Sequence, residues 1–292
     1  MSLPIVRVPK RAVAGIDAEP DVDGLRGAAS QKLSKPDRQA RILGELRAST
    51  SIRISELAAA LGVSGETIRR DLLEMGETGV LSRTYGGAVA RPFGFEPAWN
   101  ERLNEMADER GRIAALAVDL IRPGDALMID SGSTVLHFAR RIAADLKDLT
   151  VITHSFSVAM ALGGNPSFTV IACPGVYDPH EGNVTGAETV DFLQRFNVNW
   201  AIISASGITG EGPNEARAGG AAVKCAMLAR AEQNMLLIDH SKFERANLEV
   251  ICPLRRIGRV ITDRPATGRL KKALRSAGTE LSVAQADIPI EV

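Results

Sequence analysis

Apolar residues recur at helical spacing in three consecutive stretches near the start of the chain. The stretches 37–47, 55–61 and 65–78 each place their apolar side chains on one face of a helix. Between the second and the third, Gly62 can adopt the left-handed conformation that ends a helix, and Ser64 can cap the next one. The pattern predicts a helix-turn-helix, and residues 80–88 follow it with the alternation of a β-hairpin wing.

The pattern changes in the second part of the chain. Short runs of Val, Ile and Leu that end in small or acidic residues now alternate with helical stretches, which is typical of βαβ units. We therefore expect a mostly parallel sheet with helices on both faces. The runs that predict its strands are 126–130, 150–153, 169–173, 200–204, 235–239 and 260–263.

These patterns divide the chain into four parts. Residues 1–33 mix Pro, Gly, Asp and Arg without periodicity, which predicts a disordered arm. Residues 34–91 form the predicted winged helix-turn-helix domain. Two prolines and a glycine in 92–98 indicate a linker, and 99–292 form the α/β domain.

Composition narrows the class of protein. The 292 residues are 45% hydrophobic and 24% charged, which indicates a globular chain with material for two cores. Lys plus Arg and Asp plus Glu are 35 each, so a surface for nucleic acid would have to be local. No stretch has the length of a membrane helix and no signal peptide is evident, so we expect a cytoplasmic protein. The three cysteines show no metal-binding spacing and are expected to be buried thiols.

The third predicted helix carries candidate DNA-binding residues. At 100° per residue Arg70 points away from the apolar face, and Thr67 and Arg69 flank it near the N-terminal turn. A recognition helix reads base edges from this position, and Arg83 in the hairpin can contact the DNA backbone. The net charge of 35–91 is only +2, from nine basic and seven acidic residues. Spacing alone therefore leaves a protein-interaction module as an alternative.

Two loops of the α/β domain carry candidate anion-binding residues. The strand 126–130 runs into Asp130-Ser131-Gly132-Ser133-Thr134, and a helix follows. Backbone N–H groups, hydroxyls and the positive end of a helix dipole would meet there, which favours phosphate. Lys242 follows another strand and should emerge at the same edge of the sheet. Lys224 lies in a helical stretch and can either reach the ligand or face solvent.

The sequence of the first domain resembles that of the DNA-binding domain of the DeoR family of bacterial transcriptional regulators. The matching segments are Glu56-Leu57-Ala58, 63–72 and 79–88. Tyr85 stands where the family usually has histidine, and both can donate to a phosphate. The resemblance implies DNA contacts from Ser64, Thr67, Arg69, Arg70, Arg83 and Tyr85.

The second domain resembles the sensor domain of the same family. Matching segments include 130–134, 153–155, 174–177, 205–208, 222–224, 239–243 and 261–263. The resemblance implies a fold similar to ribose-5-phosphate isomerase and a site for phosphorylated sugars. We expect the effector to be bound by Asp130, Ser131, Gly132, Ser133, Thr134, Lys224 and Lys242.

We therefore predict a transcriptional regulator that represses a carbohydrate catabolic operon and needs no cofactor or metal. The partners are operator DNA, a phosphorylated sugar or polyol, and a second copy of the chain in a homodimer or homotetramer. A sugar-phosphate isomerase with a fused helix-turn-helix is the alternative. Isomerases of this type carry an acidic Gly-Ala-Asp segment where this chain has Ser204-Ala205-Ser206-Gly207, so we expect binding without catalysis. The effector and the operator stay undefined.

Overall fold

A computed structural model describes residues 33–48, 51–77, 81–84, 86–90, 102–103 and 105–285. The expected linker 92–98 lies outside the described residues, as does the expected arm except for its last residue. That residue, Leu33, packs against the core of the first domain.

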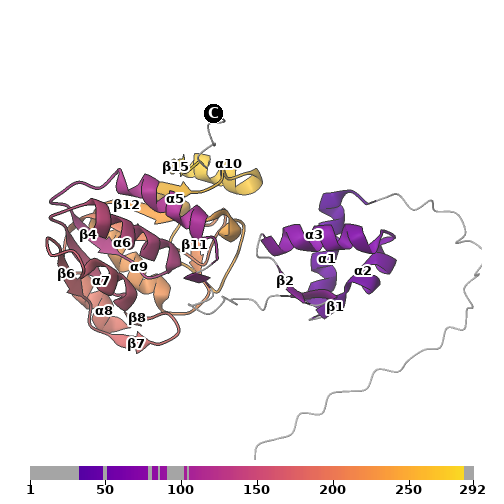
Figure 1. Ribbon diagram of the computed structural model, residues 1–292, viewed down its shortest axis with the longest axis horizontal. Coiled ribbons are helices and arrows are strands. Elements are labelled where there is room, and N and C mark those ends of the chain that lie inside the picture. The colour runs from indigo at the N-terminus through magenta and orange to yellow at the C-terminus, as the bar shows by residue number, and fades with distance from the viewer. Residues whose placement is uncertain are drawn as a thin grey trace, which may run out of the picture.

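The first domain is a three-helix unit with a three-stranded antiparallel sheet (Figure 1). Ile42, Leu57, Ile68 and Leu72 form its core with almost no exposed surface, so the predicted helical faces are confirmed. Gly62 has φ 64° and ends the second helix, as expected. The elements are α1 Lys35–Ala48, β1 Ser51–Arg53, α2 Ile54–Leu61, α3 Gly65–Glu77, β2 Leu81–Thr84 and β3 Gly87–Ala90.

Strand β1 was not expected from the sequence. Its three residues pair antiparallel with β3, which gives the sheet the order β1-β3-β2. A three-residue strand shows too little alternation to be recognised locally, and pairing with the hairpin decides its conformation.

The second domain contains a seven-stranded sheet in which all neighbouring strands are parallel. All six predicted strands are present, and β15 at the edge is an addition. Strand β4 lies between β5 and β9, so the order reverses there and creates the switch point at which open α/β sheets bind ligands. In sheet order the strands are β15 Glu280–Val283, β14 Arg259–Thr262, β12 Ala231–Leu237, β9 Val198–Ile203, β4 Ala126–Ile129, β5 Thr150–Thr153 and β6 Thr169–Ala172.

Helices cover both faces of this sheet (Figure 1). Successive residues of β4 point to opposite faces: Met128 joins the core under α8, α9 and α10, whereas Leu127 and Ile129 join the core under α5, α6 and α7. Both faces are buried, as the apolar runs predicted. The helices are α5 Ala107–Val118, α6 Ser133–Asp145, α7 Phe156–Leu162, α8 Ala187–Leu193, α9 Gly220–Ala229 and α10 Gly268–Ala277.

Two small antiparallel sheets and two 3-10 turns complete the domain. The β7–β8 hairpin follows the carboxyl end of β6, and β10 and β11 follow that of β9, so both lie next to the ligand-binding edge. The elements are β7 Val176–Asp178, β8 Asn183–Thr185, β10 Gly207–Ile208, β11 Pro213–Glu215, β13 Glu249–Val250, η1 His240–Lys242 and η2 Leu254–Arg256.

The cysteines behave as core residues. Cys173 and Cys252 are buried, Cys225 is half-buried, and all three are free thiols. Burial raises the pKa of Cys252 to about 11, which keeps it protonated at neutral pH. Among the described helices, none combines the length and apolarity that crossing a membrane requires.

Candidate functional site

The loop after β4 and the start of α6 form the floor of the site. Gly132 precedes the helix with φ 127°, and no side chain caps this end. A Cβ atom at Gly132 would lie 2.4 Å from the Ser204 hydroxyl, so the loop requires glycine. The first N–H groups of a helix have no partners within it, and the helix dipole makes this end positive. The expected anion-attracting geometry is therefore present.

A recess with an empty volume of about 380 Å³ opens above this loop. The cations Lys224 and Lys242 line it beside the loop residues Ser131 to Thr134, so segments at least 90 residues apart in sequence meet there. Its other lining residues are Arg102, Glu181, Ser204, Ala205, Ser206 and Glu215. A neighbouring recess of about 470 Å³ shares Ser131, Glu181, Glu215 and Lys224 with it.

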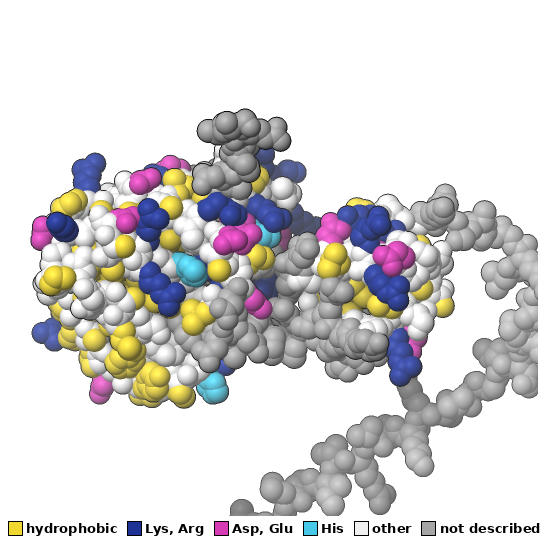
Figure 2. Space-filling model, viewed as in Figure 1, with side chains coloured by type: hydrophobic (Ala, Val, Ile, Leu, Met, Phe, Trp, Pro, Cys, Tyr) yellow, Lys and Arg dark blue, Asp and Glu magenta, His cyan; other side chains and the backbone are white. Residues whose placement is uncertain are grey.

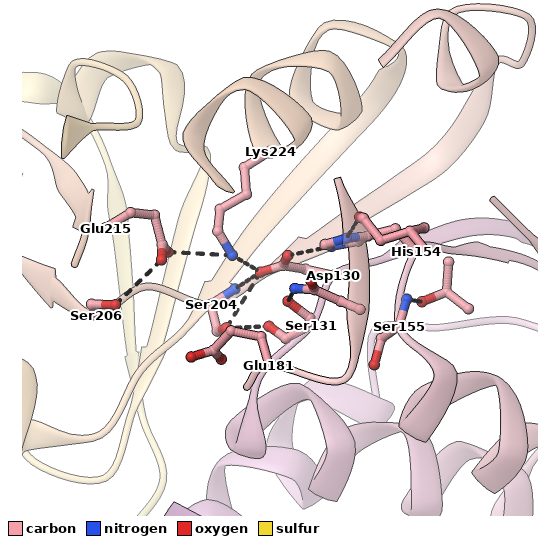
Figure 3. Close-up of polar contacts among 12 residues, drawn as sticks. Asp130, Ser131, His154, Ser155, Glu181, Ser204, Ser206, Glu215 and Lys224 are labelled. Carbon is pink, nitrogen blue, oxygen red and sulfur yellow. Dashed lines mark hydrogen bonds and ion pairs between the residues drawn. The ribbon is translucent and has the colours of Figure 1, made fainter. Parts of the chain in front are cut away.

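Asp130 is the one expected effector residue that does not line the recess. Its carboxylate is fully buried and forms an ion pair with the Lys224 ammonium. One carboxylate oxygen accepts a hydrogen bond from the Ser204 N–H at 2.9 Å, and the other lies 2.9 Å from Nε2 of His154 (Figure 3). The expectation of a direct effector contact is corrected here, because these partners enclose the carboxylate and hold it below the loop. Asp130 joins the ends of β4, β5 and β9 to α9.

Opposite charges keep this buried pair ionised. Burial by itself would raise the pKa of Asp130, but the Lys224 ammonium and the His154 hydrogen bond hold it well below its ordinary value. Burial would likewise lower the pKa of Lys224, and the carboxylates of Asp130 and Glu215 raise it instead. Lys224 Nζ lies 3.3 Å from Glu215, so one ammonium is held between two carboxylates at the wall of the recess.

Hydrogen bonds also fix the loop hydroxyls and their neighbours. The Ser131 hydroxyl accepts from Asn183 Nδ2 at 2.8 Å, and the Ser204 hydroxyl donates to the Ser131 carbonyl at 2.8 Å. The Ser206 hydroxyl donates to Glu215 at 3.3 Å. Figure 3 shows these polar side chains converging from strands and loops on Asp130 and Lys224. The hydroxyls of Ser131, Ser204 and Ser206 are therefore held in place by other residues of the chain.

Lys242 belongs to a 3-10 turn and not to a continuation of β12. Asp239 caps this turn by accepting from the Ser241 N–H at 3.1 Å. His240 opens the same turn, and its ring nitrogen Nδ1 lies 2.6 Å from Asp263 at the end of β14.

Three lining residues, Arg102, Glu181 and Glu215, were not expected. Glu215 lies in a three-residue strand, Glu181 in the turn of the β7–β8 hairpin, and Arg102 just after the expected linker. None follows one of the long apolar runs from which the strands of the main sheet were predicted. Only the fold brings them to the recess, and no signal in the sequence would have identified them.

Helix α3 exposes two of its three expected DNA-binding side chains, and Thr67 is half-buried. Arg69 and Arg70 are exposed, and Arg69 lies 3.3 Å from Glu66. The Ser64 hydroxyl accepts from the Thr67 N–H at 3.1 Å, which confirms the predicted cap and uses this hydroxyl within the chain. The side chains of Arg83 and Tyr85 lie outside the described part.

The acidic residues of α3 do not all reduce its surface charge. Asp71 is buried and pairs with Arg38 of α1, so it does not lie beside the exposed arginines of α3. Glu74 also pairs with α1, where Lys35 Nζ lies 2.5 Å from it. The two arginines therefore face solvent with Glu66 as their acidic neighbour on the first turn.

No group of three or more His, Cys, Asp or Glu side chains arranged to hold a metal occurs within the described ranges.

Comparison with known proteins identifies both domains. The family model of the DeoR-like helix-turn-helix domain matches residues 38–91, and that of the DeoR C-terminal sensor domain matches residues 105–264. The transcriptional repressor CsqR of Escherichia coli is 30% identical, over 81% of this chain and 90% of its own. The glycerol-3-phosphate regulon repressor of the same species is also 30% identical, and the match covers 73% of this chain and 85% of that protein. Ribose 5-phosphate isomerase A of Methanocaldococcus jannaschii aligns over 48% of this chain and 56% of its own, with a TM-score of 0.36 and 18% identity.

Proposed function

Because the chain belongs to the DeoR family of DNA-binding transcriptional regulators, we propose that it represses a carbohydrate catabolic operon in the cytoplasm and responds to a phosphorylated sugar or polyol. The observation that carries this proposal is the recess at the switch point of the sheet. It is surrounded by the start of α6, which no side chain caps, by the Ser133 and Thr134 hydroxyls, and by the ammonium groups of Lys224 and Lys242. This set of donors and cations suits a phosphate group.

The neighbouring recess supports a ligand with hydroxyl groups. Asn183 and Glu181 line it, and the buried Asn183 Oδ1 has no hydrogen-bond partner among the described residues. An acceptor of this kind suits a sugar hydroxyl. The glycerol-3-phosphate regulon repressor among the relatives agrees with this chemical class.

A thermal-shift screen tests the effector class. Phosphorylated sugars and polyols are compared with the same compounds lacking phosphate, at constant ionic strength. A ligand at 100 times its Kd should stabilise the chain by about 2.7 kcal/mol, and its unphosphorylated form should not. Equal stabilisation by both forms would contradict a phosphate site.

Isomerase activity is the second candidate function, and the pocket gives it little support. The two carboxylates that line the first recess, Glu181 and Glu215, are both engaged in ion pairs with cations. A general base must be close to the proton it removes and available to accept it. Turnover of ribose 5-phosphate by the purified chain would establish this alternative, and we expect none.

DNA binding is proposed to occur through the exposed face of α3. We expect Arg70→Ala to weaken operator binding by about 1–3 kcal/mol and to relax the preference at one base pair, because it would lose a base-edge contact in the major groove. The operator is first selected from random duplexes, and affinities are then measured by fluorescence anisotropy at several salt concentrations.

The control for this variant is Arg275→Ala, which removes an exposed cation from α10 of the second domain. It should leave operator affinity unchanged. A wild-type affinity of the Arg70 variant at moderate salt would remove α3 from the interface. A uniform loss on all sequences, with a smaller salt dependence, would assign Arg70 to a phosphate contact.

At least a dimer is proposed, since one winged helix contacts too few base pairs for a specific operator. We expect it to form through an apolar patch, which consists of Phe156, Met160 and Tyr177. Phe156 and Met160 lie one turn apart on α7, and the rings of Phe156 and Tyr177 meet edge to face at 5.4 Å. All three are exposed, Met160 to 80%. Figure 2 shows hydrophobic surface gathered over this region.

Met160→Glu should shift the chain towards monomer in sedimentation velocity, because a charge would have to be buried at the contact. Leu248→Glu replaces an exposed apolar residue outside the patch and should leave the association state unchanged. An unchanged oligomer in the Met160 variant would exclude the patch as the contact.

A further inference from the structure

Arg102 connects the recess to the segment that joins the two domains. It lies 11 residues beyond the end of the helix-turn-helix match at Arg91. Its side chain is only 6% exposed and lines the recess with Ser131 to Thr134 and Lys242. A guanidinium at this position adds a third cation to the wall, and it is the one closest in sequence to the DNA-binding domain.

The carboxylate of Glu181 is the partner of this guanidinium. The two side chains form an ion pair between residues 79 positions apart in sequence. Glu181 lines both recesses and is also 3.6 Å from the half-exposed Arg217. The chain thus supplies an anion of its own to the recess, and a second cation stands beside that anion.

The main chain of Arg102 is linked through two buried residues to the turn that carries Lys242, which also lines the recess. The buried Arg110 of α5 donates to the Arg102 carbonyl and forms an ion pair with Asp239 at 3.1 Å. Asp239 in turn caps the 3-10 turn that carries Lys242. The side chain of Arg102 therefore pairs with a residue that lines the recess, and its backbone is linked through Arg110 and Asp239 to the turn that carries Lys242.

We propose that Arg102 and Glu181 form an anion-responsive ion pair, in which a bound phosphate group takes Arg102 as its partner, displaces Glu181 towards Arg217, and thereby shifts the chain at the start of the second domain. The proposal rests on the function proposed above. A phosphate dianion attracts the guanidinium more strongly than a carboxylate does and repels the Glu181 carboxylate. Arg217 offers Glu181 a replacement, so the displaced carboxylate is not left without a cation.

This exchange of ion-pair partners would link phosphate binding in the recess to the control of DNA binding, because Arg102 has a different partner in each of the two conformations. A ligand can shift an equilibrium only when it interacts differently with the two conformations. In one conformation Arg102 is bound to the hairpin turn that carries Glu181, and in the other it is bound to the ligand. Glu181 also competes with the ligand and sets the concentration at which the exchange occurs.

Inorganic phosphate serves as the probe in a double-mutant cycle on the full chain. Its Kd is measured by calorimetry at constant ionic strength for the wild type, Arg102→Met, Glu181→Gln and the double variant. We expect Arg102→Met to weaken binding about tenfold or more, because one charge-assisted contact is lost. Glu181→Gln should tighten it severalfold, and this gain should disappear in the Arg102→Met background.

Exposed residues of the same domain provide matched controls. Arg122→Met and Glu188→Gln make the same chemical changes at exposed positions and should leave the Kd unchanged. A gain from Glu181→Gln of equal size in both backgrounds would mean that Glu181 acts only through its general charge, which overturns the exchange. Phosphate binding that needs Lys242 but neither Arg102 nor Glu181 also overturns it and leaves the proposed sensor function intact. No phosphate binding at all counts against both.

Tryptophan fluorescence tests the connection to the linker. Trp99 lies three residues before Arg102 in the sequence, and Trp200 is buried in the core of the sheet. Phosphate should change the emission of the wild type, and the change should be absent in Trp99→Phe and in Arg102→Met. A change that persists in Arg102→Met, or no change in the wild type, overturns the proposed shift of the chain.

Discussion

Replacing Lys224 with methionine should lower the free energy of unfolding of the second domain by about 3–5 kcal/mol, because it leaves the buried Asp130 carboxylate without its cation. Methionine keeps most of the volume of the side chain, so the effect reports charge more than packing. The measurement is urea unfolding followed by the fluorescence of the buried Trp200. Lys271→Met, on the exposed face of α10, is the control and should change stability by less than about 0.5 kcal/mol.

A double variant separates the ion pair from other contacts of Lys224. Asp130→Asn together with Lys224→Met removes both charges, and its loss of stability should be smaller than the sum of the two single losses. The remaining neighbours, His154 and Ser204, can still hydrogen-bond to the asparagine amide. Additive losses would show that the two side chains do not interact.

The pH dependence of this pair follows from the directions of the two pKa values. The pKa of Asp130 is lowered by folding, so its contribution is complete above the unfolded value near 3.8 and is lost as the pH falls below it. The pKa of Lys224 is raised, so its contribution is complete below the unfolded value near 10.5 and declines above that pH. The wild type should lose stability more steeply than the double variant at both extremes, and parallel profiles would contradict the pair's role.

Replacing Lys242 with methionine should weaken effector binding ten- to a hundredfold, the second large effect that the pocket predicts. A charge-assisted contact to phosphate contributes roughly 1.5–3 kcal/mol, and methionine keeps the bulk of the stem. Calorimetry with the phosphorylated compound that stabilises the wild type most provides the measurement. If the effector releases the operator, this variant should remain bound at effector concentrations that free the wild type.

Lys271→Met again supplies the control, because it removes the same charge from an exposed position of the same domain. Operator affinity without effector should be equal in the wild type and both variants, since Lys242 lies in the second domain. Wild-type effector affinity in the Lys242 variant would exclude this lysine from the site. The start of α6 and Lys224 would then be the remaining support for phosphate binding.

The agreement between sequence and structure is closest where a local pattern is long or chemically distinctive. The apolar runs predicted six strands of the main sheet, and the helical spacing predicted α1, α2 and α3. A strand buried on both faces gives a continuous apolar run, and a helix buried on one face gives apolar residues at helical spacing. Strands β1, β7, β8, β10, β11 and β13 have only two or three residues, which is too few for a recognisable pattern of apolar residues. Their conformation depends on the neighbours with which they pair.

The sequence by itself determined the family, the two kinds of domain, and the loop that runs from Asp130 to Thr134 into α6. It also placed Lys242 at the correct edge, because residues that follow parallel strands meet there in every open sheet. Only the tertiary structure decided that Asp130 lies below the recess and that Arg102, Glu181 and Glu215 line its wall. Desolvation and pairing of charges depend on which distant segments enclose a side chain, and that information is absent from the residue's own neighbourhood in the sequence.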